Sequence, residues 1–257
     1  INKQINRVIA MFKWAAKKEF CSGTVPPQLK TLGGLKKGRT RARETAGISC
    51  VADKIIDKTL VQLPEIVADM VRFQRLTGTR PGEVCSIRPC DIDRSKKVWI
   101  YEPDSHKTEH HEKGRIVPVG PKAQKILLPY LLRRSESFCF SPKESVERAR
   151  RKQEAGRKTP RSCGNRRGTN RVPSPKNPPS DRYKVSSYRT AIRRACDKLE
   201  MEVWTPNQLR HTAATQIRKE FGVEAAQVIC GHETADVTQV YAERDLELAI
   251  KVAEAVG

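Results

Sequence analysis

The chain has 257 residues, of which 50 are Lys or Arg and 29 are Asp or Glu, so its formal net charge is +21. Hydrophobic residues make up 37% of the chain, enough for a core of ordinary size. No run approaches the roughly 18 apolar residues of a membrane span, and no export leader is recognised. These features argue against a membrane protein, a secreted miniprotein and an acidic disordered chain. The positive charge favours a polyanionic partner, most commonly nucleic acid, over a basic protein that is merely soluble.

The N-terminal part predicts a helix followed by a basic linker. Apolar residues recur at helical spacing over residues 2–20, and two prolines at 26 and 27 interrupt the pattern. Residues 33–43 contain two adjacent Gly and five basic residues, a composition typical of a linker. One or two helices are too little for an independent core. Because the chain also begins without Met, we interpret residues 1–45 as the remnant of a domain that is cut off at its N-terminus.

Residues 47–257 predict one globular domain. Its clearest helix covers residues 64–77, where apolar side chains recur at helical spacing and Gly78 is the stop signal. Pro81 suits the first turn of a short helix that follows. The arrangement predicts a tight turn between two helices.

Two short β runs come next, at 98–100 and 116–119. They flank a polar stretch, so we expect a hairpin or a small antiparallel sheet. A helix is predicted from Pro121 to about Leu132. Residues 141–182 then contain 13 Lys or Arg, four acidic residues and six Pro, which predicts a mobile insertion without a core of its own.

The C-terminal part predicts helices only. An apolar stripe indicates a helix over 186–199, and the sequence from Thr205 to Gln208 is a capping box that begins a helix ending near Lys219. Shorter helices are expected near 223–230, 234–241 and 245–255. The fold class predicted is therefore mainly α with a small antiparallel β-sheet.

Eight scattered Cys residues, in a chain without an export signal, predict free thiols and a reducing cytoplasm. A zinc site is the alternative reading of Cys85, Cys90, His106 and His110. Their spacing is not the CxxC of common zinc sites, and Cys85 lies in an apolar stretch. Buried or bystander thiols are the favoured interpretation, and no metal or other cofactor is expected.

The absence of several common catalytic motifs limits the kinds of reaction that this sequence could catalyse. The sequence has no phosphate loop of the Walker type, no GxSxG, no HExxH and no cluster of carboxylates dense enough for a two-metal nuclease. Phosphoryl transfer without metal needs cations on the non-bridging oxygens, a nucleophile held in line and a proton donor for the leaving oxygen. Arginine suits the first task because its planar fork binds phosphate oxygens bidentately. Tyrosine can perform the second through a covalent phosphoester.

Four segments offer this set in order: Leu76–Glu83 (LTGTRPGE), Leu209–Thr212 (LRHT), Gly231-His232, and Tyr241 nine residues later. Together they resemble the motifs of the tyrosine recombinase (phage integrase) family, over about 47–257. The resemblance implies a catalytic domain of mainly helical fold with a small antiparallel sheet. It also implies a site-specific DNA recombinase that needs neither metal nor ATP.

By this resemblance, Arg80 and Arg210 clamp the scissile phosphate and His232 donates a hydrogen bond to it. Tyr241 attacks phosphorus, which leaves a 3′-phosphotyrosyl link and a free 5′-hydroxyl. Lys107 matches the family's β-strand lysine and protonates the leaving oxygen. Lys113 competes with Lys107 for this role.

Glu83 matches an acidic residue that orients rather than reacts. One position departs from the family pattern, because Asn207 stands where the family usually has His, three residues before the second Arg. An amide cannot accept the tyrosine proton near neutral pH. The adjacent His211 lies about 100° further round the helix. Another group or water is therefore expected to take the proton, or the enzyme is slower.

The resemblance further implies that residues 1–45 end a core-binding domain and that duplex DNA is the partner. Five basic residues of the linker and of the helix at 186–199 are expected to contact DNA: Arg39, Arg41, Arg43, Arg189 and Arg193. The final helix is expected to pack into a neighbouring protomer of a homo-tetramer on DNA. The fragment alone is expected to bind DNA more weakly and to be monomeric.

Two alternatives remain open at this point. A type IB topoisomerase-like enzyme would use the same chemistry to relax supercoils as a monomer. A non-catalytic DNA-binding protein with a decayed site is the alternative from another class, and Asn207 motivates it.

Overall fold

A computed structural model describes most of the chain and divides it into two compact units, Ile1–Gly47 and Ile48–Gly257. The structure describes residues 1–36, 38–43, 47–103, 115–160, 162–163, 174–176 and 178–231. Within these ranges, none of the helices is both long and apolar enough to cross a bilayer.

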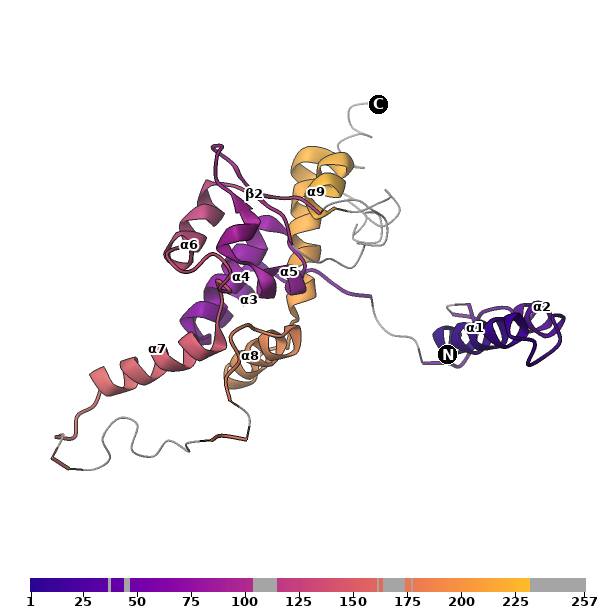
Figure 1. Cartoon of the computed structure of the whole chain (residues 1–257), viewed down its shortest axis with the longest axis horizontal. Coiled ribbons are helices and arrows are strands. Elements are labelled where there is room, and N and C mark those ends of the chain that lie inside the picture. The colour runs from indigo at the N-terminus through magenta and orange to yellow at the C-terminus, as the bar shows by residue number, and fades with distance from the viewer. Residues whose placement is uncertain are drawn as a thin grey trace. The chain divides into compact units, whose positions relative to one another are not determined.

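The N-terminal unit consists of two helices, α1 (Asn2–Lys17) and α2 (Val25–Lys30), shown in indigo in Figure 1. The prolines at 26 and 27 lie after the end of α1, which agrees with the predicted interruption of the first helix. They occupy the first turn of α2, where a missing N–H costs no hydrogen bond. The Asn2 side chain exchanges two hydrogen bonds with the backbone of Leu35, at 2.8 and 2.9 Å, and so ties the start of α1 to the chain beyond α2.

The second unit is mainly helical with a three-stranded sheet, which confirms the predicted fold class. Its helices are α3 (Asp53–Gln62), α4 (Glu65–Thr77), α5 (Pro81–Ser86), α6 (Pro121–Leu131), α7 (Pro142–Ala155), α8 (Val185–Lys198) and α9 (Pro206–Cys230), with a 3₁₀ turn, η1, at Pro89–Asp91. The strands are β1 (Ile92–Asp93), β2 (Trp99–Tyr101) and β3 (Val117–Val119), in the order β1-β2-β3 with antiparallel pairing. In the register, Tyr101 pairs with Ile92 on one side and with Val117 on the other.

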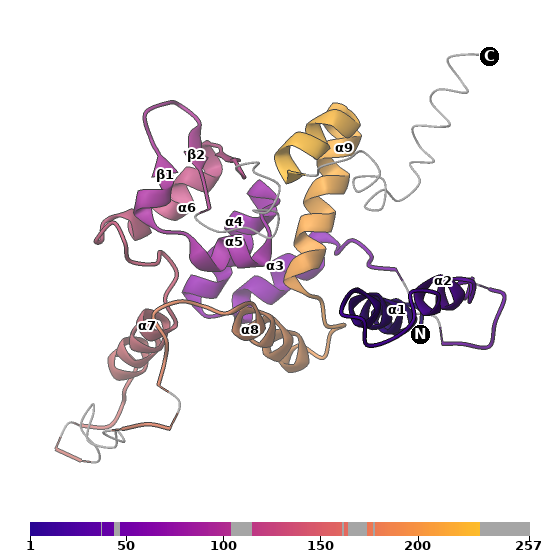
Figure 2. The ribbon, with the colours of Figure 1, turned by 45° about the vertical axis from the view of Figure 1, so that its right-hand side comes forward.

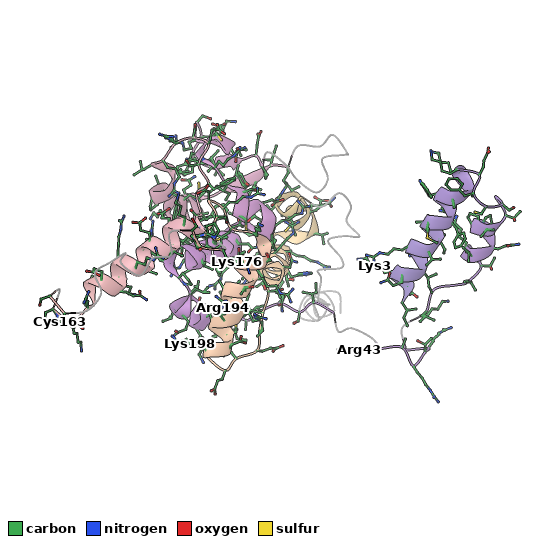
Figure 3. The ribbon with its side chains drawn as sticks, turned by 60° about the horizontal axis from the view of Figure 1, so that its bottom comes forward. Lys3, Arg43, Cys163, Lys176, Arg194 and Lys198 are labelled. Atoms are coloured by element: carbon green, nitrogen blue, oxygen red, sulfur yellow. The ribbon has the colours of Figure 1, made fainter. Side chains whose placement is uncertain are left out.

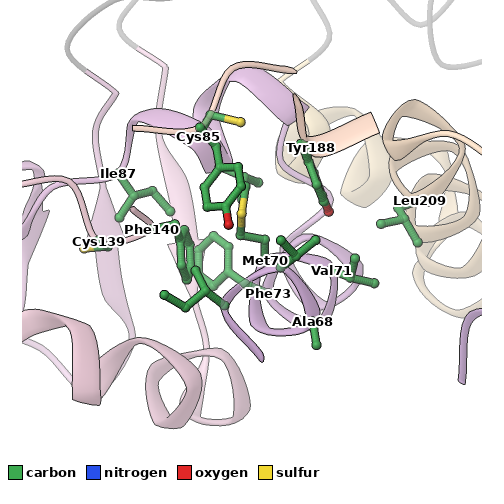
Figure 4. Packing of buried hydrophobic residues seen from close by; sticks show 14 of the residues in the cluster. Ala68, Met70, Val71, Phe73, Cys85, Ile87, Cys139, Phe140, Tyr188 and Leu209 are labelled. Atoms are coloured by element: carbon green, nitrogen blue, oxygen red, sulfur yellow. The ribbon is translucent and has the colours of Figure 1, made fainter. Parts of the chain in front are cut away.

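The core forms around α4, as its apolar stripe predicts. Met70, Val71 and Phe73 are fully buried. Figure 4 shows Met70 and Phe73 packed with side chains from other elements, among them Phe140 and Tyr188. Figure 2 shows α4 between α9 on one side and the sheet with α6 on the other. This central helix ends at the turn that carries Arg80, so the core fixes the position of that turn.

The first part of the predicted insertion is a helix, α7, and it buries no core of its own. It occupies the first third of residues 141–182 and projects from the rest of its unit (Figures 1 and 2). None of its residues is buried, so the sequence has no apolar stripe that would predict this helix. Local features stabilise it instead, because Ser141 caps its N-terminus and Arg148 pairs with Glu144 at 2.7 Å. Arg148 also pairs with Glu65 of α4 at 3.0 Å, which ties α7 to the rest of its unit.

The two helices that follow agree closely with the sequence pattern. In α8 the predicted stripe is buried, with Tyr188 and Ile192 fully enclosed. α9 begins at Pro206 as predicted, and the expected division near residue 220 lies at Gly222, whose φ of 88° and ψ of 175° are not helical. The helices expected near 234–241 and 245–255 lie outside the described residues.

One buried amide connects three elements of the second unit. The Gln74 side chain is fully buried and donates to the carbonyls of Thr79 at 2.9 Å and of Pro206 at 3.0 Å. Its oxygen accepts a hydrogen bond from the hydroxyl of Tyr188 at 3.0 Å. The α4–α5 turn, α8 and the start of α9 therefore meet at one side chain.

Replacing Gln74 with Leu should lower the free energy of unfolding by about 3 kcal/mol, because two carbonyls and one hydroxyl would stay buried without their partner. Urea unfolding followed by circular dichroism measures the change. The matched control is Gln216→Leu on the exposed face of α9, expected to change stability by less than about 0.5 kcal/mol. Equal stability of the two variants would contradict the role assigned to Gln74.

Candidate active site

The turn between α4 and α5 presents the first predicted arginine. α4 ends at Gly78, whose φ of 62° lies in the left-handed region that favours glycine. The carbonyl of the next residue, Thr79, is held by Gln74. Arg80 then takes the N-cap position of α5, with Pro81 in the first turn. The Arg80 side chain, 25% exposed, therefore starts from a backbone that is fixed on both sides.

Glu83 binds both the backbone and the side chain of Arg80. Its Oε2 accepts the backbone N–H of Arg80 at 2.8 Å, and its Oε1 accepts Nη1 of the guanidinium at 2.7 Å. The Glu83 side chain is only 4% exposed. The hydroxyl of Tyr101 in β2 donates to the carbonyl of Glu83 at 2.8 Å, which anchors α5 to the sheet. This arrangement supports an orienting role for Glu83.

Arg210 lies one turn into α9 and is 4% exposed. The helix start is fixed because the backbone N–H of Thr205 donates to Oε1 of Gln208 at 2.8 Å. Nη1 of Arg210 donates to the carbonyl of Gly78 at 2.9 Å, and Nη2 donates to the carbonyl of Cys230. The second predicted arginine thus connects the α4–α5 turn to the far end of its own helix.

The two arginines converge at the C-terminal end of α9. Nη2 of Arg80 lies 3.4 Å from the carbonyl oxygen of Gly231, and Nη2 of Arg210 binds the carbonyl of the preceding residue. A methyl group added to Gly78 would lie 3.6 Å from Sγ of Cys230, so the turn and the helix end are packed together. Both guanidinium groups therefore lie beside the same helix end. The negative end of the helix dipole favours cations there.

A third arginine belongs to this cluster, and sequence reasoning missed it. Arg115 precedes β3, its side chain is 4% exposed, and its Nε lies 3.5 Å from Oε1 of Glu83. The alternation of side chains along the strand could have indicated its burial, because Val117 and Val119 are buried while Ile116 is half exposed. Arg115 shares the parity of the buried valines and so falls on the inward face. The polar stretch before it hid that continuation.

The cluster carries more positive than negative charge. Three guanidinium groups meet one carboxylate, that of Glu83, in a mostly buried place. The pKa of Arg115 lies below its ordinary value because of burial, and the charges of Arg210 and Arg80 add to this effect, while Glu83 opposes it. Buried charge is costly unless it is paired. An anion bound beside these residues would relieve the repulsion among them.

The first two turns of α9 carry the two other supporting residues. Asn207 is exposed, and His211 is half-buried. The pKa of His211 lies below its ordinary value, mainly because of burial and also because of the charge of Arg210. A neutral imidazole next to the second arginine is therefore expected near neutral pH.

The remaining predicted catalytic residues lie outside the described residues. They are Lys107 with its competitor Lys113, His232 and Tyr241. His232 directly follows Gly231, whose carbonyl lies beside Arg80. The described part of the site ends at that residue.

The residues expected to contact DNA are exposed in both units. Arg39, Arg41 and Arg43 lie in the coil after α2, and Arg189 and Arg193 lie on α8. Figure 3 labels Arg43 in the coil after α2, and Arg194 and Lys198 on α8. On α8, the apolar stripe faces the core and the basic residues face outward.

The described residues do not favour the zinc alternative. Cys85 is buried in the core, where burial raises the pKa of its thiol to about 12, so a thiolate ligand is disfavoured. Cys90 is exposed. Both histidines of the alternative, His106 and His110, lie outside the described residues. Among the residues that the structure describes, no group of three or more His, Cys, Asp or Glu is placed to hold a metal ion.

Several solved structures share this fold. The chain is similar to the Tn1549 transposon integrase in complex with a circular intermediate DNA, with 15% identity, a TM-score of 0.62, and 99% of this chain and 78% of that chain covered. A lambda integrase fragment, solved as a dimer bound to a core site, is 12% identical with a TM-score of 0.60, and the match covers 95% of this chain and 73% of that chain. The XerA recombinase is 20% identical with a TM-score of 0.50, and the match covers 99% of this chain and 83% of that chain. No curated protein matches the chain.

These likenesses establish the fold but not the family, because the identities are low. The family is shown by sequence: the profile of the Phage integrase family matches residues 52–247, which is most of the chain. The matched range contains the α4–α5 turn and α9, the two elements that bring Arg80 and Arg210 together. The chain therefore belongs to the phage integrase family.

Proposed function

We propose that the protein is a site-specific DNA recombinase that cleaves and rejoins duplex DNA through a covalent 3′-phosphotyrosyl intermediate, without metal or ATP. Family membership and the DNA-bound neighbours support site-specific recombination as the general activity and DNA as the partner. One observation carries the mechanism. Arg80 and Arg210 bind adjacent carbonyls at one end of α9, so two guanidinium groups are held ready for one phosphate.

Arg80 and Arg210 bind the non-bridging oxygens of the scissile phosphate. A guanidinium carries five N–H groups, and the hydrogen bonds among the described residues use two of them in each of these arginines. The remaining donors suit an oxyanion whose charge grows in the transition state. Because Glu83 and the α9 carbonyls fix both side chains beforehand, little reorganisation is needed when the phosphate becomes pentacoordinate.

Tyr241 supplies the nucleophile in this proposal. Its phenol oxygen forms a bond to phosphorus as the bond from phosphorus to the 5′-oxygen breaks. Lys107 gives a proton to the leaving 5′-oxygen, and His232 donates a hydrogen bond to the phosphate. The phosphotyrosine conserves the bond energy, so a 5′-hydroxyl from the partner strand can reverse the step and rejoin DNA.

The phenol proton needs an acceptor other than Asn207. The exposed amide can bind a phosphate oxygen but cannot take a proton near neutral pH. Water or another group of the site therefore accepts the proton, and cleavage is slower than with a histidine base.

DNA and protein contacts complete the proposal. Residues 1–45 belong to a core-binding domain, and its linker arginines and the exposed arginines of α8 contact the duplex. The active form is a homo-tetramer on DNA, in which the C-terminal helix packs against a neighbouring protomer, whereas residues 1–257 alone are monomeric. The protein acts in the bacterial cytoplasm or nucleoid.

A nicked suicide duplex tests the function. Direct repeats in the DNA that flanks the gene define the duplex. After cleavage, the short oligonucleotide with its 5′-hydroxyl diffuses away and the protein stays attached to the 3′ end. We expect a covalent adduct in a denaturing gel, in equal yield with and without excess EDTA. Strict dependence on a divalent metal would contradict the mechanism. Binding that weakens with salt, together with no adduct on any suicide substrate, would instead indicate a non-catalytic DNA-binding protein.

A further inference from the structure

Arg115 contacts three separate parts of the second unit through one side chain. Its Nη1 donates to the carbonyl of Ile116 at 2.9 Å, and its Nη2 donates to the carbonyl of Ile229 in α9 at 3.0 Å. Its Nε faces Glu83 at 3.5 Å. The same Glu83 oxygen also accepts the guanidinium of Arg80. Arg115 therefore joins the start of β3, the end of α9 and the Glu83–Arg80 pair.

The end of α9 is shaped to fit Arg115. Gly231 has a φ of 60°, and a methyl group added to it would lie 2.4 Å from Nη1 of Arg115. The left-handed backbone favours glycine there, and the guanidinium packed against it would have to shift to admit a larger side chain. Three successive carbonyls at this helix end, those of residues 229, 230 and 231, each accept from a different arginine. Arg115 binds the first of them.

We propose that Arg115 is a positioning residue for strand cleavage, which holds the end of α9 against the Glu83–Arg80 pair and so sets the geometry of the two arginines that bind phosphate. The proposal rests on the proposed function. Arg115 acts through Glu83 and through the α9 backbone, and it does not touch the scissile phosphate. Its planar fork matters more than its charge, because a single ammonium cannot reach both carbonyls and the carboxylate.

The first test compares Arg115→Lys and Arg115→Met in the full chain. Single-turnover cleavage of the suicide duplex should slow by roughly 100-fold in both, since displacement by about 1 Å costs this much. The dissociation constant for DNA should change by less than about threefold at fixed salt, because a displaced phosphate clamp lowers transition-state stabilisation more than binding. The matched control is Arg133→Lys, an arginine that binds the Phe138 carbonyl and Glu144 away from this cluster. It should cleave at the rate of the wild type.

A neutral scissile diester separates positioning from direct contact. A methylphosphonate lacks the charge that a phosphate-binding arginine neutralises, so it should partly restore cleavage by Arg210→Ala. It should not restore cleavage by Arg115→Met, because that variant has lost geometry rather than a phosphate contact. Equal restoration of the two variants would show that Arg115 touches the phosphate and would overturn the proposal.

Unfolding provides a readout that does not depend on activity. Gly231→Ala should destabilise the wild type more than it destabilises Arg115→Met, because removing the guanidinium removes the steric conflict. Equal costs in both backgrounds would overturn the proposed packing. Wild-type cleavage rates in folded Arg115→Lys, or loss of folding in both Arg115 variants, would overturn the positioning role. A wild-type chain that forms no adduct, with the coupling to Gly231 intact, would overturn the proposed function and with it the catalytic part of this inference.

Discussion

Replacing Tyr241 with Phe should abolish the covalent adduct on the suicide duplex, a loss of more than ~10⁴-fold. Phenylalanine keeps the ring but lacks the oxygen that bonds to phosphorus. A denaturing gel with labelled DNA measures the adduct. DNA binding, measured by gel shift at fixed salt, should be unchanged, because the hydroxyl is required for chemistry and contributes little to affinity.

The other tyrosines of the chain are poor candidates for the nucleophile. The chain has five, and four of them, Tyr101, Tyr130, Tyr183 and Tyr188, are buried in the core. Burial raises the pKa of each of these phenols above its ordinary value, which disfavours a phenolate nucleophile.

Tyr183→Phe is the matched control, because this tyrosine lies in the core, apart from the arginine cluster. It should form the adduct at the wild-type level. An adduct that survives Tyr241→Phe and disappears in a core variant would show that the nucleophile is wrongly assigned.

Apolar periodicity and the capping box predicted helices that pack against the core. The helix α4 was predictable because apolar residues at helical spacing precede Gly78, and the structure buries that stripe and ends the helix there. The start of α9 was predictable from Thr205 and Gln208. Helix α7 was not, because surface ion pairs such as Arg148–Glu144 and a capping serine stabilise it without burial. Hydrophobic periodicity carries no signal for such a helix.

The sequence predicted the site residues and their order along the chain, but not the contacts between them. The motifs around Arg80 and Arg210 placed these residues in the right family pattern, yet the pattern does not show that both bind the end of α9. Gln74 looked like one more member of a stripe, although its amide joins the two arginine-bearing segments. Arg115 lay beyond a polar stretch that obscured the strand period. In each case the missing information was a contact between segments far apart in the sequence.

Replacing Arg210 with Lys should slow single-turnover cleavage by roughly 10²–10³-fold, the effect of losing one preorganised donor to a developing oxyanion. Lysine preserves the charge but presents one ammonium in place of a planar fork. In the folded protein, the guanidinium reaches the carbonyls of Gly78 and Cys230 together, and an ammonium cannot keep both while binding phosphate. The dissociation constant for DNA should rise only a fewfold at fixed salt, because other basic residues supply most of the electrostatic affinity.

Arg72→Lys is the matched control, since Arg72 forms an exposed pair with Asp69 on α4 and is expected to have no effect on cleavage. The comparison with Arg80→Lys is more informative still. Arg80 is 25% exposed and rests on Glu83, whereas Arg210 is almost fully buried between two backbone carbonyls. Both variants should lose cleavage, but Arg210→Lys should also lose stability, because it leaves a buried carbonyl without its donor. Wild-type cleavage by Arg210→Lys, with folding intact, would mean that charge alone suffices and that the fork at the end of α9 is not a phosphate clamp.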